Sequence, residues 1–308
     1  MDKMLKISSS PHIHCGTSTT SIMRDVIIAL VPASVAGTLI FGLRSLLVIA
    51  VCVASCVLFE FLFSLIAKKD RTIGDLSAAV TGLLLALNLP ANIPFWQCVV
   101  GCLFAIVIVK ALFGGIGRNL VNPAITARVF MLVSFGNMAT QAFPKGVDTV
   151  SGATPLEQIA NDNTPKLLDL FLGTTGGAIG ETCAAALILG FIYLLVRRVI
   201  TWHIPVSFVG SVFVLSYFLE GFDAMKALAL ILSGGLIIGA VFMATDYVTS
   251  PATARGKIVY GIGAGVLTVL IRYFGVYPEG VSFAILFMNI LNPYIGKFTA
   301  RKVFGGTK

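Results

Sequence analysis

A short polar stretch, residues 148–155, carries the side chains with the clearest capacity for chemistry. It reads Asp148-Thr149-Val150-Ser151-Gly152-Ala153-Thr154-Pro155, in a chain that is 57% hydrophobic. The hydroxyl groups of Ser151 and Thr154 stand among small residues, where a modifying enzyme can reach them, and Asp148 could help to bind the metal–nucleotide substrate of that enzyme. The alternative is a plain connector, because Ser, Gly, Thr and Pro favour turns.

Two acidic side chains in or beside apolar segments are candidates for an ion pathway. Glu60 stands about two helical turns before Lys68, deep enough that an unpaired carboxylate is costly. It is expected to pair with a basic group or to bind Na⁺ or a proton. Asp246 follows an apolar segment, and the alternative for it is a cap of the next helix. Lys110 is predicted to reach toward the cytoplasmic surface along its aliphatic stem.

The elements that position these residues are predicted to be membrane helices. The mean hydropathy is +0.94, and only 12% of the residues are charged. Apolar runs of about 17–25 residues recur, long enough to cross the hydrocarbon core as helices, and the alternation of a membrane β-barrel is absent. The chain is therefore an all-α polytopic membrane protein. Ten spans are predicted, at residues 25–42, 45–67, 75–90, 94–113, 123–137, 181–199, 205–220, 224–243, 257–275 and 281–297.

The basic residues orient these spans. With both termini in the cytoplasm, 17 of the 22 Lys and Arg residues fall on the inner side, Arg128 among them, and 5 fall outside. The net charge of +8 is then a positive-inside bias and gives no reason to expect nucleic-acid binding. The longest polar stretch, with Thr154, lies on the external side.

The spans divide the chain into two halves. The predicted units are a cytoplasmic tail (1–24), a first five-helix half (25–137), an external loop (138–180), a second five-helix half (181–297) and a cytoplasmic tail (298–308). Because five is odd, the second half runs with inverted orientation, an arrangement on which many transporter folds are built. A five-plus-five inverted repeat is predicted from this topology alone.

Most of the six cysteines lie inside apolar runs and are expected to be packing residues. Cys52 and Cys56, and likewise Cys98 and Cys102, are spaced to share one helix face. The two pairs could form one cluster, but no C-x-x-C spacing supports an iron–sulfur site.

Several motifs along the chain carry a family resemblance. They are the runs at 81–90 (TGLLLALNLP), 113–119 (FGGIGRN), 122–124 (NPA), 148–155 (DTVSGATP), 244–251 (ATDYVTSP) and 278–280 (PEG). With them the chain resembles, over nearly its whole length, the family that unites the D subunit of the Rnf electron-transport complex with the B subunit of the sodium-pumping NADH:quinone oxidoreductase. The length of 308 residues resembles the Rnf subunit, because the quinone-reducing relative has a longer N-terminal region.

The resemblance implies two flavins. A dedicated transferase would esterify the phosphate of FMN to Thr154, with Asp148, Ser151, Gly152 and Ala153 forming the recognition loop. Asn119 and Asn122 align with a pair of amides at a second flavin, a non-covalent riboflavin near the cytoplasmic face. Amide groups suit the donor and acceptor edge of a flavin ring. The alternative for the Asn-Pro pair is a capped helix start.

The resemblance also implies the activity. The chain is expected to be a flavoprotein subunit of an ion-translocating ferredoxin:NAD⁺ oxidoreductase in a bacterial or archaeal cytoplasmic membrane. It would relay electrons between the covalent FMN and the second flavin, coupled to Na⁺ or H⁺ movement. Its partners would be a membrane flavoprotein, iron–sulfur and nucleotide-reducing subunits, and the lipid bilayer. The alternatives are the B subunit of the quinone-reducing relative and a small-solute channel of inverted-repeat fold.

Overall fold

The computed structural model describes residues 18–68, 73–136, 144, 154–161, 164–275 and 280–300. Thr154 is within this part, whereas Asp148, Ser151, Gly152 and Ala153 lie outside the described residues. All the helices and helix breaks discussed below belong to these ranges. Every regular element found in them is helical, which confirms the predicted all-α class.

The helices follow the apolar runs of the sequence. Those of the first part of the chain are α1 (Thr19–Phe41), α2 (Leu43–Ile66), the 3₁₀ turn η1 (Ile73–Asp75), α3 (Ser77–Leu87), α4 (Phe95–Leu103), the π-helical segment η2 (Phe104–Ala111) and α5 (Pro123–Ser134). Two short helices follow, α6 (Pro155–Ala160) and α7 (Leu167–Leu172). The remaining ones are α8 (Ala184–Val196), α9 (His203–Leu219), α10 (Ala224–Leu232), α11 (Leu236–Ile238), the π-helical segment η5 (Gly239–Met243), α12 (Ala254–Phe274) and α13 (Val281–Phe298).

Each of the ten predicted spans coincides with a helix or an interrupted helix, but many are short. In the described part, α1, α2, α12 and α13 are long and apolar enough to cross a membrane. The pair formed by α10 and α11–η5 makes a fifth if it counts as one span, although it bends by 65°. Five further apolar helices have 10–17 residues. Broken and short helices are tolerated in a bilayer where neighbouring protein satisfies the freed backbone groups.

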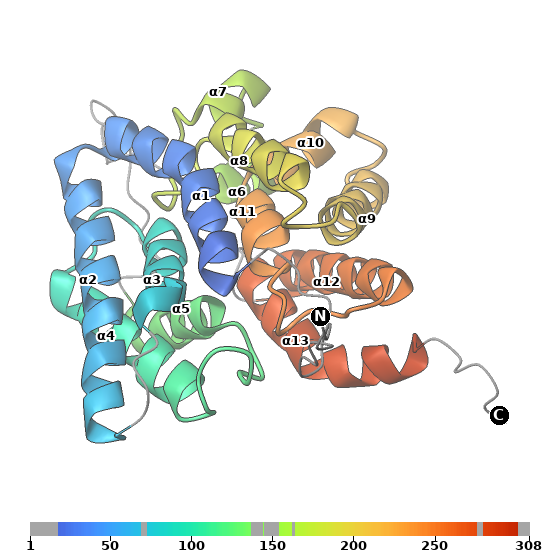
Figure 1. The fold of residues 1–308 in the computed structure, drawn as a ribbon. Coiled ribbons are helices and arrows are strands. Elements are labelled where there is room, and N and C mark those ends of the chain that lie inside the picture. Colours follow the sequence, from blue (N-terminus) through green and yellow to red (C-terminus); the bar gives the residue numbers. More distant parts are fainter. Residues whose placement is uncertain are drawn as a thin grey trace, which may run out of the picture.

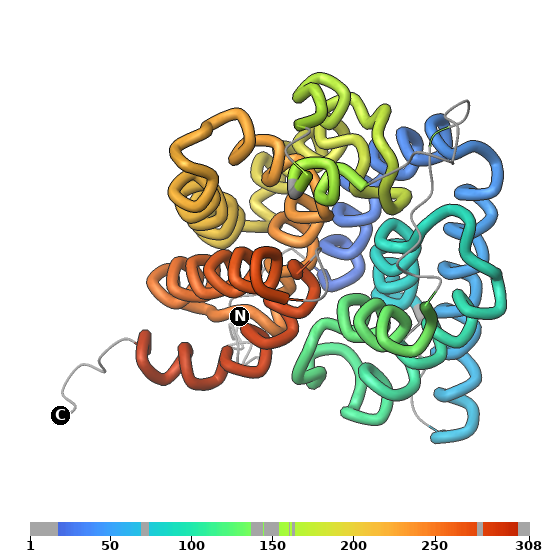
Figure 2. The backbone as a smooth tube through the Cα atoms, turned by 180° about the vertical axis from the view of Figure 1, so that it is seen from behind, coloured from blue at the N-terminus to red at the C-terminus, as the bar shows by residue number. Residues whose placement is uncertain are grey.

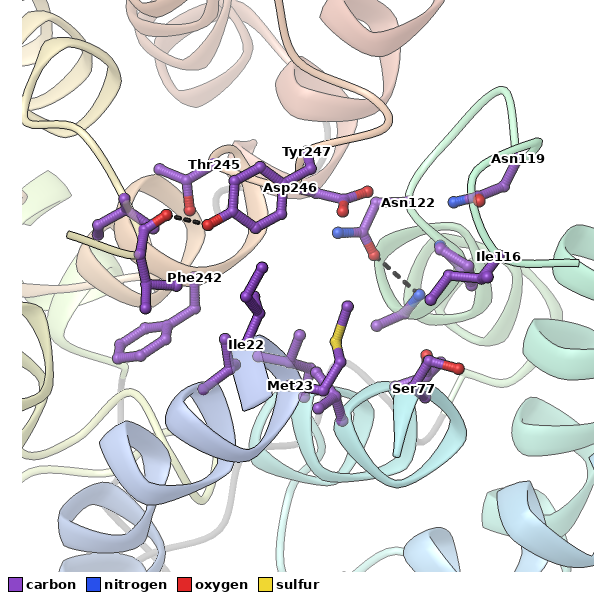
Figure 3. A pocket seen from close by; sticks show the side chains of 18 of the residues that line it. Ile22, Met23, Ser77, Ile116, Asn119, Asn122, Phe242, Thr245, Asp246 and Tyr247 are labelled. Atoms are coloured by element: carbon purple, nitrogen blue, oxygen red, sulfur yellow. Dashed lines mark hydrogen bonds between the residues drawn. The ribbon is translucent and has the colours of Figure 1, made fainter. Parts of the chain in front are cut away.

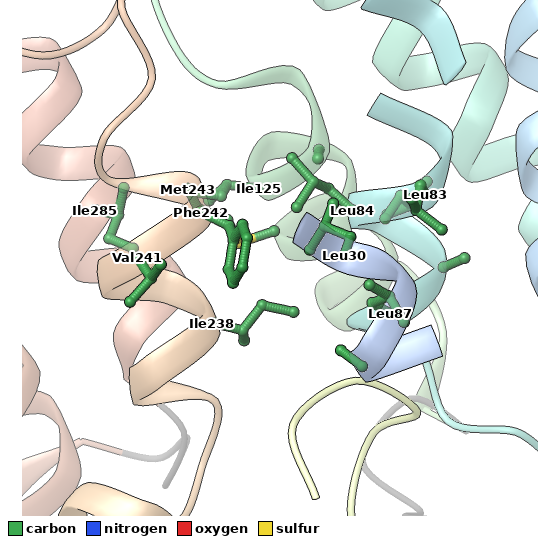
Figure 4. Close-up of a cluster of buried hydrophobic side chains, with 14 of the residues drawn as sticks. Leu30, Leu83, Leu84, Leu87, Ile125, Ile238, Val241, Phe242, Met243 and Ile285 are labelled. Atoms are coloured by element: carbon green, nitrogen blue, oxygen red, sulfur yellow. The ribbon is translucent and has the colours of Figure 1, made fainter. Parts of the chain in front are cut away.

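The helices form one bundle in which α1 lies between two groups. Figures 1 and 2 show α2 to α5 on one side of the molecule and α9, α12 and α13 on the other. Helix α1 contacts α2 and α3 of the first group and α8 of the second. Both groups contribute to the buried core in Figure 4, where Leu30 of α1, Leu84 of α3 and Phe242 of η5 meet. The two predicted halves are therefore packed together through α1.

The contact between α1 and α8 depends on a glycine. A Cβ atom added at Gly190 of α8 would lie 2.3 Å from the carbonyl oxygen of Ala29 in α1. Gly190→Ala is therefore expected to lower the free energy of unfolding by about 1–3 kcal/mol, because a backbone carbonyl cannot turn aside as a side chain can. Gly210→Ala in α9 is the matched control, since nothing lies within 4 Å of its added Cβ. It should be neutral or stabilising by up to about 1 kcal/mol. Thermal unfolding of the purified protein measures both, and equal melting temperatures would contradict the close approach.

Candidate functional site

Thr154 begins helix α6 with its hydroxyl group at the N-cap. The Oγ1 atom accepts a hydrogen bond of 3.1 Å from the backbone N–H of Glu157, and the Glu157 carboxylate accepts one of 2.9 Å from the N–H of Thr154. Pro155 follows at the first helical position, where no N–H is needed. Among the described residues the Thr154 hydroxyl has no acceptor for its own proton. A phosphoester would replace that proton and could leave the capping bond in place.

The helix that follows Thr154 packs on the break between α10 and α11. Leu156 belongs to a small buried cluster with Ile159, Leu170 and residues of α10. A Cβ atom added at Gly234 would lie 2.5 Å from Cδ1 of Leu156. Gly234 has a φ of +66°, a conformation that favours glycine. The chain leaving Thr154 is thus fastened to a helix break inside the bundle.

Polar side chains fill this break. Arg272 donates hydrogen bonds of 2.7 Å and 3.0 Å to the carbonyl oxygens of Leu230 and Ser233, which the end of α10 leaves without helical partners. Beside Gly235, the carboxylate of Glu181 and the guanidinium of Arg128 lie 2.9 Å and 3.6 Å from the position of an added Cβ. The break therefore brings an acid and two arginines into the bundle.

Arg128 connects the break to the end of α3. Its guanidinium is buried and donates a hydrogen bond of 2.6 Å to Oδ1 of Asn88. The prediction that Arg128 lies among the inner surface charges is wrong, because hydropathy does not distinguish a charge at the membrane surface from one bonded inside the protein. Asn88 in turn contacts the sulfur of Met243 at 3.6 Å, and Asn122 donates to the Met243 carbonyl at 3.2 Å. We call Glu181, Arg128, Asn88, Met243 and Asn122 the polar path.

The polar path ends at a pocket formed by both groups of helices and α1. Figure 3 shows Met23 of α1 on one side of this central pocket, with Asn122 and Asp246 across from it. Its lining is mostly apolar, with a few polar groups, which is the usual character of a small-molecule site. It encloses about 790 Å³ including its open mouth, of which about 100 Å³ is free cavity. Side chains of its wall must therefore shift to admit a three-ring system.

Asn119 and Asn122 both line this pocket, as their predicted role requires, but they differ in their bonds. Oδ1 of Asn122 accepts from the N–H groups of Ala124 and Ile125 at 3.0 Å and 3.4 Å, so Asn122 is the cap of α5. The helix-start alternative is confirmed for this residue. Asn119 makes a weaker local bond, from Nδ2 to the Val121 carbonyl at 3.3 Å. In the described residues its Oδ1 has no donor, which leaves Asn119 the better placed amide for a ligand.

Asp246 lines the same pocket from the turn after η5. Its carboxylate accepts a hydrogen bond of 3.1 Å from the Thr249 hydroxyl and further bonds from backbone N–H groups of the turn. Burial raises the pKa of Asp246 above its usual value, and these bonds oppose the shift in part. Asp246 does not cap the next helix, because Thr253 is the N-cap of α12. The capping alternative for Asp246 is therefore wrong.

Comparison with known proteins places the chain in a family. A family model described as the NQR2, RnfD, RnfE family matches residues 6–305. The chain belongs to this family.

Three relatives in the NQR2, RnfD, RnfE family match the chain almost end to end, and each is the D component of a membrane complex. That of the Na(+)-translocating ferredoxin:NAD(+) oxidoreductase complex of Acetobacterium woodii is 47% identical, over 99% of this chain and 96% of its own. That of the proton-translocating ferredoxin:NAD(+) oxidoreductase complex of Clostridium ljungdahlii is 42% identical, over 97% and 96%. That of the ion-translocating oxidoreductase complex of Escherichia coli is 34% identical, over 99% of each chain.

Glu60 lies in a buried network that also involves Lys110. The Lys110 ammonium donates to Oε1 of Glu60 at 2.7 Å and to the hydroxyl of Ser77 at 2.5 Å. Ser77 in turn donates to Asp75 at 2.5 Å. Of the roles predicted for Glu60, pairing with a base is confirmed. The prediction that Lys110 reaches to the surface is wrong, because only 4% of the residue is exposed.

Four cysteines of α2 and α4 come together, although sequence spacing alone favoured no site. Cys52, Cys56, Cys98 and Cys102 are fully buried, and the Cys102 thiol contacts the carbonyl of Cys52 at 3.5 Å. The Cys102 side chain also contacts those of Cys52 and Cys56. In the described part of the chain, no group of three or more His, Cys, Asp or Glu residues is disposed to hold a metal ion. The four thiols act here as small buried packing groups.

The residues that sequence reasoning missed are the partners in this interior. Asn88 and Glu181 were read only as parts of a motif and a loop, and Asp25 only as the start of a span. Asp25 is buried and accepts bonds from Tyr193 and Arg197 of α8, the latter at 3.2 Å. A polar residue at the end of an apolar run was the available signal, since such groups need a partner in a bilayer.

Proposed function

We propose that this chain is the flavin-carrying membrane subunit of an ion-translocating ferredoxin:NAD⁺ oxidoreductase complex. The observation that carries the proposal is Thr154. It ends the S-G-A-T stretch expected of a flavinylated threonine, in a chain that matches the D components of such complexes over 97–99% of its length. The chain belongs to a multi-subunit assembly in this proposal and does not act as a complete enzyme by itself.

FMN would be held through a phosphoester bond to Oγ1 of Thr154. The hydroxyl proton, which has no acceptor among the described residues, is the atom that esterification removes, and the capping bond from Glu157 can persist. A flavin transferase would recognise Asp148, Ser151, Gly152 and Ala153 before the threonine. FMN supplies one- and two-electron transfer when bound. A covalent link prevents its loss from an exposed position.

Riboflavin is the ligand we propose for the central pocket. The apolar walls of the pocket suit a flat aromatic ring, and Asn119 offers an amide to its polar edge. Asn122 contributes by fixing the start of α5 and by joining the pocket to the polar path. The polar path then lies between the two proposed flavin positions, through the interior of the bundle.

Electrons would pass between these two flavins across the membrane. In this proposal the FMN lies near the external face and exchanges electrons with another membrane-anchored flavoprotein subunit. The riboflavin lies near the cytoplasmic face, on the side of the iron–sulfur and nucleotide-reducing subunits, and both termini are cytoplasmic. The membrane is the cytoplasmic membrane of a bacterium or archaeon.

Ion movement would involve Glu60 and Asp246. Glu60 is paired with Lys110, and Asp246 lines the central pocket with a raised pKa. The pairing makes Glu60 a group whose charge is already compensated, so any ion it binds must compete with Lys110. The relatives are named for Na⁺ in one case and for protons in another, at 47% and 42% identity. We therefore propose coupling to Na⁺ or H⁺ without a choice between them.

The covalent flavin can be tested on the unaltered protein. The complex, purified from a host that has the transferase, is denatured and separated by electrophoresis. A fluorescent flavin band at the 32.6 kDa chain is the expected result. A dark band in a preparation whose transferase modifies another known target would refute the FMN proposal.

The second flavin is tested through Asn119. Asn119→Leu is expected to weaken riboflavin binding about tenfold, the worth of one hydrogen bond between ligand and protein. The measurement is the quenching of riboflavin fluorescence on titration with the purified chain in lipid nanodiscs. Asn92→Leu is the matched control, because Asn92 is exposed and lies away from the pocket. Equal affinity in the two variants would remove Asn119 from the site.

A further inference from the structure

A second, larger cavity lies at the junction of α2, η2 and the loop that follows η2. It encloses about 1240 Å³ including its mouth, of which about 580 Å³ is free cavity. The walls include Phe63 of α2 and Ile106 of η2, and the floor includes Glu60 and Lys110. The Glu60–Lys110 pair therefore separates this cavity from the central pocket, which Lys110 also lines. We call it the basic cavity.

The charges of the basic cavity favour an anion. Glu60 and Lys110 compensate each other through their ion pair. Lys68 and Arg118 are both exposed at the cavity and have no salt-bridge partner in the described residues, so the lining has a net charge of about +2. Lys110 has three donors and uses two, on Glu60 and Ser77, which leaves one for a ligand on the floor.

The loop is shaped to hold Arg118 over the cavity. Gly114 has a φ of +113°, and a Cβ atom added there would lie 2.8 Å from Cδ of Arg118. A glycine at this position thus satisfies the backbone turn and lets the Arg118 side chain lie across it. A guanidinium held in this way can donate two parallel hydrogen bonds to a phosphate group.

The surroundings of the cavity are those of a lipid site. Ile66 at the end of α2 is 82% exposed, and Leu112 and Phe113 after η2 are 65% and 56% exposed. A free phosphate ion would make no use of these apolar side chains, whereas acyl chains would cover them. Basic pockets between membrane helices on the cytoplasmic side bind acidic headgroups.

We propose that the basic cavity binds an anionic phospholipid. The headgroup phosphate would lie between Arg118 and Lys68, above Lys110, and its acyl chains would run along Ile66, Leu112 and Phe113. This site is separate from both proposed flavin positions, and its existence does not depend on the proposed function.

The test uses the intact complex and native mass spectrometry, with this chain ejected from the complex to count its bound lipids. Phosphatidylglycerol is titrated, with phosphatidylcholine as the zwitterionic comparison. The double variant Lys68→Gln/Arg118→Gln is expected to bind phosphatidylglycerol about 30-fold more weakly. Arg198→Gln/Arg255→Gln removes the same charge from exposed residues outside the cavity and should bind as the unaltered protein does.

Three results would overturn the proposal. One is unchanged phosphatidylglycerol binding in Lys68→Gln/Arg118→Gln. Another is full competition by inorganic phosphate, which would make the site one for a soluble anion. The third is an acidic side chain of a partner subunit seated on Arg118 in a structure of the complex. The charge-conserving variant Lys68→Arg guards against misfolding, since it should keep affinity within about threefold if charge is what matters.

Discussion

Thr154→Ala chains are expected to carry no covalent flavin when they are produced beside the transferase. The hydroxyl oxygen of Thr154 is the only atom proposed to form the phosphoester, so its removal should abolish the adduct completely. Intact-mass and peptide mass spectrometry check this: a flavin-sized mass should be present on the peptide that contains Thr154 and absent in the variant. An adduct that persists on the same peptide would assign the flavin to another residue.

Two control variants separate the ester from the helix cap. Thr154→Ala also removes the N-cap of α6, at a cost of about 1 kcal/mol. Glu157→Ala removes the reciprocal carboxylate of the capping box but leaves the Thr154 hydroxyl, so it should keep the flavin. Thr154→Ser keeps both the cap and a hydroxyl. Loss of the adduct in Glu157→Ala as well would mean that the capping geometry, and not the hydroxyl alone, decides modification.

The helical class and the positions of the apolar segments could be predicted because the bilayer dictates both. A segment in hydrocarbon must satisfy its own backbone, so an apolar run of suitable length reads as a helix. The bend at Ser233–Gly235 could be suspected from its glycines, but its size of 65° could not. That angle depends on Arg272 and Leu156, which come from distant parts of the sequence and pack into the break.

The candidate site was predictable where its signals are local. The Asn122-Pro123 start of α5 is such a signal, and the structure shows the expected cap. The partners of charged residues are not local. Lys110 lies 50 positions from Glu60, and Arg128 lies 40 positions from Asn88. Hydropathy assigned both bases to the inner surface because it contains no information on which helices are neighbours.

Lys110→Met is expected to destabilise the protein by about 3–5 kcal/mol, the cost of leaving a buried charge without its partner. The side chains of Lys110 and Glu60 are 5% and 9% exposed, so water cannot replace the lost ammonium. The double variant Glu60→Met/Lys110→Met removes both charges and should recover most of this loss. Thermal unfolding of the single and double variants gives the coupling between the two residues. As a contrast, Arg197→Met should cost only about 1 kcal/mol, because the Arg197 side chain is 49% exposed.

The same double variant distinguishes a structural pair from an ion pathway. If the pair only holds α2 against η2 and α3, the complex with Glu60→Met/Lys110→Met should be stable and should still move ions, measured as uptake into proteoliposomes during electron transfer. If Glu60 exchanges ions in competition with Lys110, the stable double variant should transfer electrons without ion uptake. A double variant as unstable as Lys110→Met alone would contradict the buried pair itself, because two well-packed methionines leave no charge to compensate.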